Sequence, residues 1–455
     1  MRPVTLLLGL LVPGALVSAE FRAGLARRDI TPQVPFWLSG YAARTNPAVR
    51  VNSALWAKAL ALEDQTSIRV VIVTTDLIGL PREISTAAAV RVQEQSSVPR
   101  ENIFFNSSHT HAGPVVWPNL RVMFDLNPAD QEAAIAYAQR LTTALADVAS
   151  EALSQLEPAR LKFGLGHATY AINRRQPATD GIRLGENPAG PVDHDVPVLR
   201  IENPQGHLRA VLFGYACHNT TLVGNNYEID GDYAGAAQHA LEQDHPGITA
   251  LFLMLCGGDQ NPSPRGTLQL AREHGKTLAA AVTATLNREL KSVEPALKAA
   301  YQEITLEFAP HTRETFETES QSDHIFRQRR ARLMLEAYAE GNPVRDVVYP
   351  IQAIRLGPDL ALLGLGGEVV VDYGLNLKRE YGTDRLIVAG YCNDVVCYIP
   401  TVRVLREGGY EPVDSMIYYG QPGPFANSVE TTILDAARAT LSQSGFTRAR
   451  PADDP

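Results

Sequence analysis

Two histidines lie two residues apart, directly after an apolar run that predicts a buried strand. His109 and His111 belong to the segment Asn-Ser-Ser-His-Thr-His-Ala-Gly-Pro at 106–114. On extended chain, side chains at i and i+2 point to the same side, so both imidazoles can approach one metal ion. The Gly-Pro pair predicts a turn, and strand ends commonly carry functional sites. The alternative is a hydrogen-bonded pair of loop histidines without a metal.

A third histidine and a glutamate occur in the same kind of place. His218 ends the apolar run 211–217 and is followed by Asn-Thr-Thr, which is typical of the rim of a site. Glu368 follows Gly-Leu-Gly-Gly after another predicted strand and is expected to open a helix. Alternatively, His218 is a satisfied core or loop residue and Glu368 only offsets a helix dipole. Strand-end histidines with a carboxylate can hold zinc in an open, catalytic geometry.

A glycine-containing loop, Cys-Gly-Gly-Asp-Gln-Asn-Pro-Ser-Pro at 256–264, interrupts an apolar strand. Glycine permits close backbone approach, so exposed N–H groups in this loop could hold an oxyanion. The alternative is a tight turn held by the side chains of Asp259 and Asn261. Asp76 and Arg174 also lie at predicted strand or loop ends. Considered alone, each of them is interpreted as a residue with a structural role.

Several familiar catalytic signatures are absent from the sequence. It contains no HExxH helix, no GxSxG nucleophile elbow, no EF-hand loop and no CxxC pair. A Ser-His-Asp hydrolase and a zinc ribbon therefore have little support. What remains is a set of histidines and a carboxylate at strand ends, which favours metal-dependent chemistry.

The elements that would position these residues alternate between strands and helices. Near-continuous apolar runs predict strands at 68–75, 102–106, 160–165, 196–201, 210–216, 249–255, 351–356, 360–365 and 386–389. Helices are predicted at 84–95, 131–156, 233–243, 268–290, 323–339, 369–380 and 428–442. The alternation predicts an α/β fold with a large mixed β-sheet core flanked by helices. We expect a single catalytic domain, and the charged stretch 313–346 is the alternative boundary.

Composition limits the class of partner. The 455 residues are 45% hydrophobic and 20% charged, and 41 Lys and Arg against 50 Asp and Glu give a formal net charge of −9. An acidic chain without a basic block disfavours nucleic acid and tight docking on anionic membranes. Beyond the N-terminus, no apolar run approaches the length of a membrane span. We expect a small-molecule or lipid substrate, no transmembrane anchor, and at most transient membrane contact.

The first 19 residues predict a signal peptide. Arg2 supplies the positive end, 4–12 an apolar core, and Val-Ser-Ala at 17–19 a cleavage pattern. A buried first strand is the alternative, which Pro-Gly at 13–14 weakens. The sequence thus predicts a secreted or periplasmic protein with a hydrolase domain at 20–447 and a frayed tail at 448–455.

Four cysteines in such a compartment allow disulfides with three full pairings. Cys392 and Cys397 are close enough in sequence to clip a loop, whereas Cys217 and Cys256 lie in apolar runs typical of buried thiols.

Taken together and in this order, the segments resemble the neutral/alkaline non-lysosomal ceramidase family. The resemblance extends from Ser-Gly-Tyr-Ala at 39–42 to about residue 420, and its most specific part is the His-Thr-His-Ala-Gly-Pro segment. The other matching positions are His218 with its polar cluster, Gly258-Asp259, Gly367-Glu368, Tyr398-Ile399 with Thr401, and Tyr410-Glu411.

The family consists of zinc amidohydrolases that split N-acylsphingosines into sphingosine and a fatty acid. The resemblance therefore implies Zn²⁺ as cofactor and a ceramide-like substrate attacked by water activated at the zinc. It assigns zinc ligation to His109, His218, Glu368 and Tyr398.

The resemblance also implies roles around the scissile amide. His111, or a neighbouring carboxylate, would move a proton to the leaving amine, and Arg174 and Tyr410 would stabilise charge on the carbonyl oxygen. We further expect Asp76 to hydrogen-bond a ligand imidazole.

Two departures bear on the substrate. Asn261 stands where the family's active-site serine is expected, and an amide can donate a hydrogen bond but cannot act as a nucleophile. We keep Asn261 as a candidate catalytic residue on that basis. The family's C-terminal β-sandwich domain is expected to be absent, and the stretch 261–368 is short. The alternatives are a secreted metallohydrolase with a different amide or ester substrate, and a non-catalytic extracytoplasmic ligand-binding protein.

Overall fold

The computed structural model describes residues 20–448, so the predicted signal peptide and residues 449–455 of the predicted tail lie outside the described residues. A nine-stranded mixed sheet has the order β12-β10-β9-β6-β1-β3-β4-β5, with β14 beside β6. The pairs β4–β5 and β10–β12 are parallel. The strands are β1 (Phe21–Asp29), β3 (Trp56–Glu63), β4 (Arg69–Thr75), β5 (Ile103–Ser107), β6 (Glu157–His167), β9 (Asp195–Glu202), β10 (Leu208–Tyr215), β12 (Thr249–Met254) and β14 (Lys291–Val293).

A second sheet of four strands packs face to face on the first. It has the order β15 (Leu297–Glu307), β16 (Asp346–Leu356), β17 (Leu360–Leu365) and β19 (Leu386–Ala389), with β17 and β19 parallel. Phe104 and Leu212 of the first sheet share a buried cluster with Ile354 and Leu362 of the second. The mixed α/β fold predicted from the sequence is confirmed, but its core consists of two sheets rather than one.

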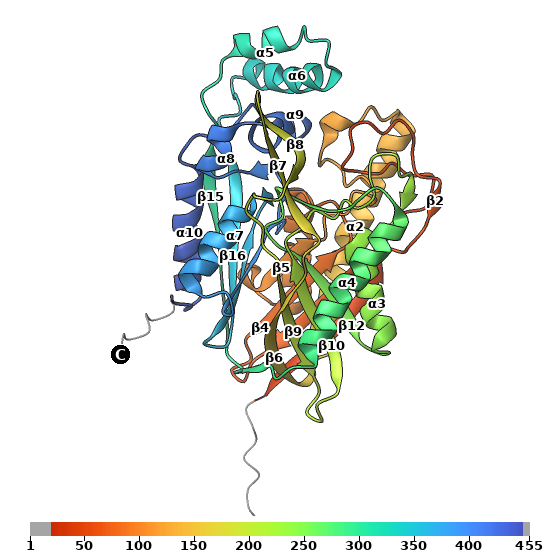
Figure 1. Cartoon of the computed structure of the whole chain (residues 1–455), viewed down its shortest axis with the longest axis vertical. Coiled ribbons are helices and arrows are strands. Elements are labelled where there is room, and N and C mark those ends of the chain that lie inside the picture. The colour runs from red at the N-terminus through yellow and green to blue at the C-terminus, as the bar shows by residue number, and fades with distance from the viewer. Residues whose placement is uncertain (1–19, 449–455) are drawn as a thin grey trace, which may run out of the picture.

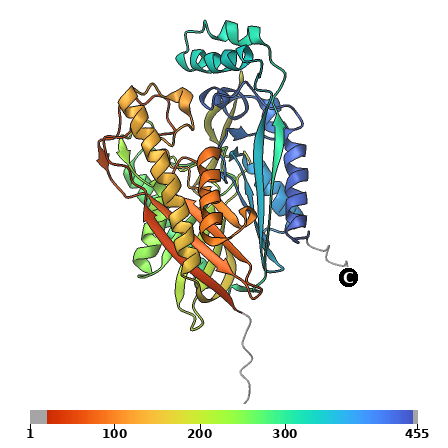
Figure 2. The same ribbon diagram turned by 180° about the vertical axis from the view of Figure 1, so that it is seen from behind.

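Helices cover the outer face of each sheet (Figures 1 and 2). Val71 and Val73 of β4 point towards the helices, and the alternate residues Val70 and Ile72 point towards the second sheet, as the two-residue period of a strand requires. The helices α1 (Arg82–Ser96), α2 (Pro128–Ser154), α3 (Asp232–Asp244) and α4 (Leu268–Leu286) cover the nine-stranded sheet, and α7 (Val371–Tyr381) and α10 (Val429–Gln443) cover the four-stranded sheet. The result is a four-layer arrangement.

Shorter elements surround the ends of the central strands. The charged stretch 313–346 forms a helical hairpin at the top of Figure 1 and contacts α9. The short strands are β2 (Arg50–Val51), β7 (Ala171–Ala178), β8 (Gly181–Asn187), β11 (Glu228–Ile229), β13 (Gln260–Pro262), β18 (Glu368–Val369) and β20 (Tyr398–Ile399). The short helices are η1 (Arg100–Asn102), η2 (Arg121–Met123), α5 (Arg313–Glu319), α6 (Ile325–Ala339), α8 (Val402–Glu407), η3 (Tyr410–Asp414) and α9 (Ser415–Tyr418).

The two edge strands of the nine-stranded sheet, β5 and β12, come together near their carboxyl ends. The side chain of Asn106 donates to the carbonyl of Met254 over 3.1 Å and accepts from the N–H of Met254 over 2.8 Å. It also donates to the carbonyl of Gly390, directly after β19, over 2.8 Å. One buried amide thus ties together the strand ends from which the candidate site residues emerge.

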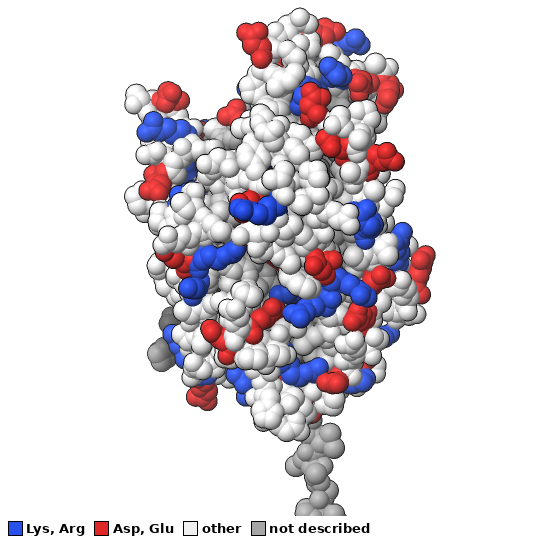
Figure 3. Space-filling view, turned by 90° about the vertical axis from the view of Figure 1, so that its right-hand side faces the viewer, with Lys and Arg blue, Asp and Glu red and all other residues white. Residues whose placement is uncertain are grey.

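All four cysteines are buried free thiols, so the disulfides that the sequence allows do not form in this structure. No helix in the described part of the chain has both the length and the apolar character needed to cross a membrane. On the face drawn in Figure 3, Lys and Arg are interspersed with Asp and Glu.

Candidate metal centre and active-site pocket

Four side chains from different strand ends form one cluster, in which two imidazoles face the same carboxylate oxygen. Oε2 of Glu368, in β18, lies 2.9 Å from Nε2 of His109 and 3.0 Å from Nε2 of His218. Nε2 of His218 is also 3.0 Å from the hydroxyl of Tyr398 in β20. His109 follows β5 and His218 follows β10, and β18 pairs with β20 in parallel. The structure therefore brings all four predicted zinc ligands together.

His111 joins this cluster on its outer side. Its Nε2 lies 3.0 Å from Nε2 of His109, and donor atoms of His109, His111 and His218 all lie within 4.8 Å of one another. Nδ1 of His111 is buried without a hydrogen-bond partner. This ring packs against Gly40, where φ is +88° and an added Cβ would lie 2.4 Å from Nδ1 of His111. Only glycine fits at that position.

The tautomers of two histidines follow from backbone contacts. Nδ1 of His109 lies 2.6 Å from the carbonyl of Ile78, and Nδ1 of His218 lies 2.7 Å from the carbonyl of Gly257. A carbonyl only accepts, so each Nδ1 carries the proton and each Nε2 presents a lone pair. The sequence-based expectation that Asp76 supports a ligand imidazole is wrong. The Asp76 carboxylate instead accepts from the N–H of Trp56 and from Gln238, because it is buried beside α3.

Electrostatics favour an ionised Glu368 carboxylate and neutral imidazoles at His111 and His218. Burial alone would raise the pKa of the Glu368 carboxyl, but His109 and His218 hold this pKa well below its usual range. Burial and then the charge of Arg174 lower the pKa of His218 to about 3. Burial, followed by the two neighbouring histidines, lowers the pKa of His111 well below its usual range.

The donor set fits a divalent cation. The lone pairs of His109 Nε2 and His218 Nε2 face a carboxylate oxygen that is also an acceptor, and all three groups are buried. Acceptors about 3 Å apart repel one another unless a cation lies among them. Imidazole nitrogens with a carboxylate form a set typical of Zn²⁺.

Two tyrosines that the sequence did not single out hold the carboxylate. The hydroxyls of Tyr391 and Tyr419 donate to the two oxygens of Glu368, Tyr391 over 3.4 Å. Burial raises the pKa of both hydroxyls, so they remain protonated donors. Neither tyrosine stands in a distinctive motif, so only the fold reveals them.

Arg174 connects the cluster to a buried ion pair. It donates to the hydroxyl of Tyr398 over 3.0 Å and to Glu411 over 2.8 Å. Glu411 also pairs with Arg175, so this buried carboxylate compensates two guanidinium groups. The guanidinium of Arg174 lies 5.6 Å from the centre of the Tyr410 ring. The predicted residues Arg174 and Tyr410 therefore lie beside the proposed metal ligand Tyr398.

Asn261 lies in the same group and keeps a donor available. Its Oδ1 accepts from Arg174 over 3.3 Å and lies 3.5 Å from the hydroxyl of Thr220, which leaves its Nδ2 without a protein partner among the described residues. In the glycine-containing loop 256–264, the N–H groups of Gly257 and Gly258 are not free to hold an oxyanion. Those groups already donate to the carbonyls of Leu255 and Val369.

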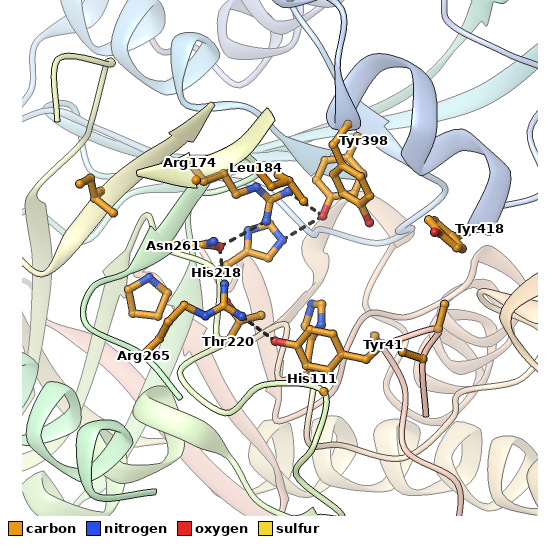
Figure 4. A pocket seen from close by; sticks show the side chains of 18 of the residues that line it. Tyr41, His111, Arg174, Leu184, His218, Thr220, Asn261, Arg265, Tyr398 and Tyr418 are labelled. Carbon is orange, nitrogen blue, oxygen red and sulfur yellow. Dashed lines mark hydrogen bonds between the residues drawn. The ribbon is translucent and has the colours of Figure 1, made fainter. Parts of the chain in front are cut away.

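These residues line a cavity of about 520 Å³, which is within the range of small-molecule sites. Figure 4 shows His111 and His218 in its middle, with Arg174 and Tyr398 on one side. Tyr41, Arg265 and Tyr418, which the sequence did not single out as site residues, complete the wall.

Comparisons with known proteins agree with this geometry. The family model described as neutral/alkaline non-lysosomal ceramidase, N-terminal, matches residues 21–251, just over half of the chain. The neutral ceramidase of Pseudomonas aeruginosa is 24% identical over 275 residues, covering 56% of this chain and 39% of that protein. The neutral ceramidase of Mycobacterium tuberculosis is 23% identical over 385 residues, covering 68% of this chain and 60% of that protein.

The fold is also similar to a solved structure. The crystal structure of the neutral ceramidase from Pseudomonas aeruginosa matches with a TM-score of 0.73 at 19% identity, covering 96% of this chain and 77% of that one. At this identity the likeness concerns the fold. The chain spans between about two fifths and three fifths of the length of the two relatives compared above.

Proposed function

Because the chain belongs to the neutral/alkaline non-lysosomal ceramidase family, we propose that it is a zinc-dependent amidohydrolase that cleaves an N-acyl amide resembling an N-acylsphingosine. The observation that carries the proposal is the cluster beside a cavity in which His109 and His218 face Glu368 and Tyr398 contacts His218. His111, Arg174, Tyr410 and Asn261 would act on the substrate itself.

The ligand set would be His109, His218, Glu368 and Tyr398, each from a different strand end. A bound zinc ion supplies Lewis-acid polarisation of a carbonyl group and acidification of a water molecule. The backbone carbonyls of Ile78 and Gly257 hold the imidazoles with their lone pairs inward.

The remaining residues would each have a separate chemical role in amide cleavage. The carbon–nitrogen bond breaks while water supplies a hydroxyl to the acyl carbon and a proton to the leaving nitrogen. His111 is neutral, so it can accept this proton and deliver it to the amine. The protonated Tyr410 hydroxyl and Nδ2 of Asn261 can donate to the carbonyl oxygen as it becomes negative. Since Asn261 cannot be acylated, water is the nucleophile that this site favours.

Metal analysis combined with an acyl-release assay tests the proposal. The purified full chain should contain about one zinc per molecule, and it should release fatty acid from an N-acylsphingosine or a shorter N-acyl amide. Protein that carries no stoichiometric metal, or metal-loaded protein that is inactive on every N-acyl amide, would contradict it.

Asn261 favours a second candidate, a metallohydrolase that acts on an ester or a different amide. Parallel assays on matched amide, ester and phosphoester substrates distinguish the two candidates. Clear preference for N-acylsphingosine would exclude the second one. Export from the cytoplasm stays a proposal that depends on residues 1–19.

A further inference from the structure

One cation on the pocket wall has no anionic partner. Nη2 of Arg265 donates to the hydroxyl of Tyr41 over 2.9 Å, and its Nε is buried without a hydrogen-bond partner. Within the described residues, no carboxylate lies within 4.0 Å of this guanidinium. Arg174 and Arg175 differ, because both pair with Glu411. Arg265 lines the pocket, and a guanidinium on a pocket wall without an anionic protein partner can pair with an anionic group of a ligand.

The surroundings of Arg265 hold it in place. The hydroxyl of Tyr41 donates to the carbonyl of Leu222 over 3.0 Å, so its remaining lone pair is free to accept from Arg265. The N–H of Gly266 donates to the carbonyl of Thr221 over 2.8 Å and anchors the chain next to Arg265. The Tyr41 ring also lies 4.8 Å from the His111 ring, centre to centre. Tyr41 thus connects Arg265 to His111 of the catalytic cluster.

A second uncompensated arginine adds to the positive potential here. The guanidinium of Arg44 lies 5.0 Å from the centre of the Tyr41 ring and donates to backbone carbonyls of Ser39 and Asn226. Its Nη2 is buried without a partner. Burial lowers the pKa of the Arg44 guanidinium to about 10. A chain with a net charge of −9 therefore carries two arginines without an ion-pair partner around Tyr41, of which Arg265 lines the pocket.

Two carboxylates lie in the neighbourhood without forming an ion pair with Arg265. Asp232 is buried and accepts from the backbone N–H groups of Leu222 and Tyr233. Glu186 is exposed at the rim, where it accepts from the hydroxyl of Ser263. Neither forms an ion pair with Arg265 within 4.0 Å.

The cationic side chain of Arg265 and an apolar wall lie on opposite sides of the pocket. Figure 4 shows Arg265 and Tyr418 on opposite sides, with His111 and His218 between them. Met123 also lines the pocket, and its element η2 contacts α9, which carries Tyr418. An amide held at the histidines would direct its acyl chain towards Met123 and Tyr418 and its amine part towards Arg265.

We propose that Arg265 binds a carboxylate on the amine part of the substrate, so that the preferred substrates are anionic N-acyl amino acids rather than neutral N-acyl lipids. The inference rests on the proposed hydrolysis of an N-acyl amide, and it replaces the sphingosine-like amine part of that substrate with an amino acid. Hydrolysis then yields a fatty acid and a free amino acid. Arginine suits this role because its planar group matches a carboxylate.

The test compares soluble substrates that differ in charge. N-octanoylglycine carries the carboxylate on the amine part, N-octanoylethanolamine is its neutral counterpart, and the mono-ethanolamide of nonanedioic acid carries the carboxylate on the acyl part. The variants are Arg265→Gln, Arg265→Lys and Arg379→Gln, each in the full chain. Arg379 is exposed and bonds only Asn376, so its variant makes the same change in net charge away from the pocket.

Two readouts are measured, kcat/KM and the Kd from calorimetry, and the second does not depend on turnover. We expect the wild type to prefer N-octanoylglycine over both other compounds. Arg265→Gln should reduce this preference about ten-fold or more, as expected for one hydrogen-bonded charge. Arg265→Lys should restore part of it, and Arg379→Gln should keep the wild-type preference.

The outcomes separate this inference from the proposed function. Hydrolysis of the neutral amide without a charge preference, or an unchanged preference in Arg265→Gln, would overturn the role of Arg265 and leave the amidohydrolase function standing. Preferential binding of N-octanoylglycine that is lost in Arg265→Gln, without cleavage of any amide, would support Arg265 and overturn the amidohydrolase function. Preference for the nonanedioic derivative would place the anion on the acyl part and reject the proposed orientation.

Discussion

The side chain of Asn106 in β5 hydrogen-bonds both the N–H and the carbonyl of Met254 in β12. It therefore links the two edge strands in the way that the backbone of a neighbouring strand would. His109 follows three residues after Asn106, and the loop that continues from Met254 supplies the carbonyl of Gly257, which orients His218. We therefore expect this amide to contribute to the spacing of the two histidines.

Replacing Asn106 with alanine should weaken the fold and the metal centre together. The change leaves the N–H and carbonyl of Met254 without partners in a buried place, which costs about 3 kcal/mol of unfolding free energy. Urea unfolding and zinc content measure the two effects. Asn102→Ala is the matched control, because Asn102 bonds the carbonyl of Arg69 at the opposite end of β5. Full zinc occupancy in Asn106→Ala would show that the amide does not position the site.

Removing one proposed ligand should abolish metal binding while the fold persists. His109→Ala and His218→Ala each delete an imidazole that faces Glu368, and we expect zinc content below a tenth of the wild-type value and loss of turnover, because only one imidazole remains with the carboxylate and the phenol hydroxyl. Elemental analysis and circular dichroism are the measurements. His207→Ala, which changes an exposed histidine in a turn, should retain zinc. Stoichiometric zinc in both ligand variants would place the metal elsewhere.

Arg174 and Arg175 share Glu411, but only Arg174 reaches Tyr398. Arg174→Lys keeps the charge and loses the planar donor group, so kcat/KM should fall about a hundred-fold, as for removal of one donor to a developing charge. Arg175→Lys should lower the melting temperature with little effect on kcat/KM. Equal kinetic effects of the two substitutions would mean that the ion pair matters only for folding.

Asp394 should make the stability of the protein depend on pH. Burial, followed by the charge of Glu83, raises the pKa of this carboxyl to about 7. A raised pKa means that the folded state disfavours the ionised form, so stability is highest below the unfolded pKa near 4 and declines as the pH rises towards 7, by about 1.4 kcal/mol per pH unit. Asp394→Asn removes this decline. Urea unfolding at pH 5 and at pH 7 should show the gap between variant and wild type widening, and parallel curves would refute the buried ionisation.

The elements with continuous apolar runs were predictable, and those with interrupted patterns were not. Strands β4, β5, β10, β12 and β17 lie close to their predicted ranges because burial on both faces demands apolar residues throughout. Strand β1, with the sequence FRAGLARRD, was missed because its charged residues are exposed at its end. The helix predicted from 369 begins at Val371, and Glu368 lies in β18 before it, where it pairs with Tyr398.

The sequence by itself determined the residue types of the site, because a histidine, a glutamate or a tyrosine directly after an apolar strand is a local pattern. Only the tertiary structure decided which of these side chains meet. Contacts such as Tyr419 with Glu368 and Arg265 with Tyr41 join residues 51 and 224 positions apart. The packing of two sheets brings such groups together, and no local spacing records it. The unpaired charge of Arg265 likewise becomes visible only when every neighbour of the guanidinium is known.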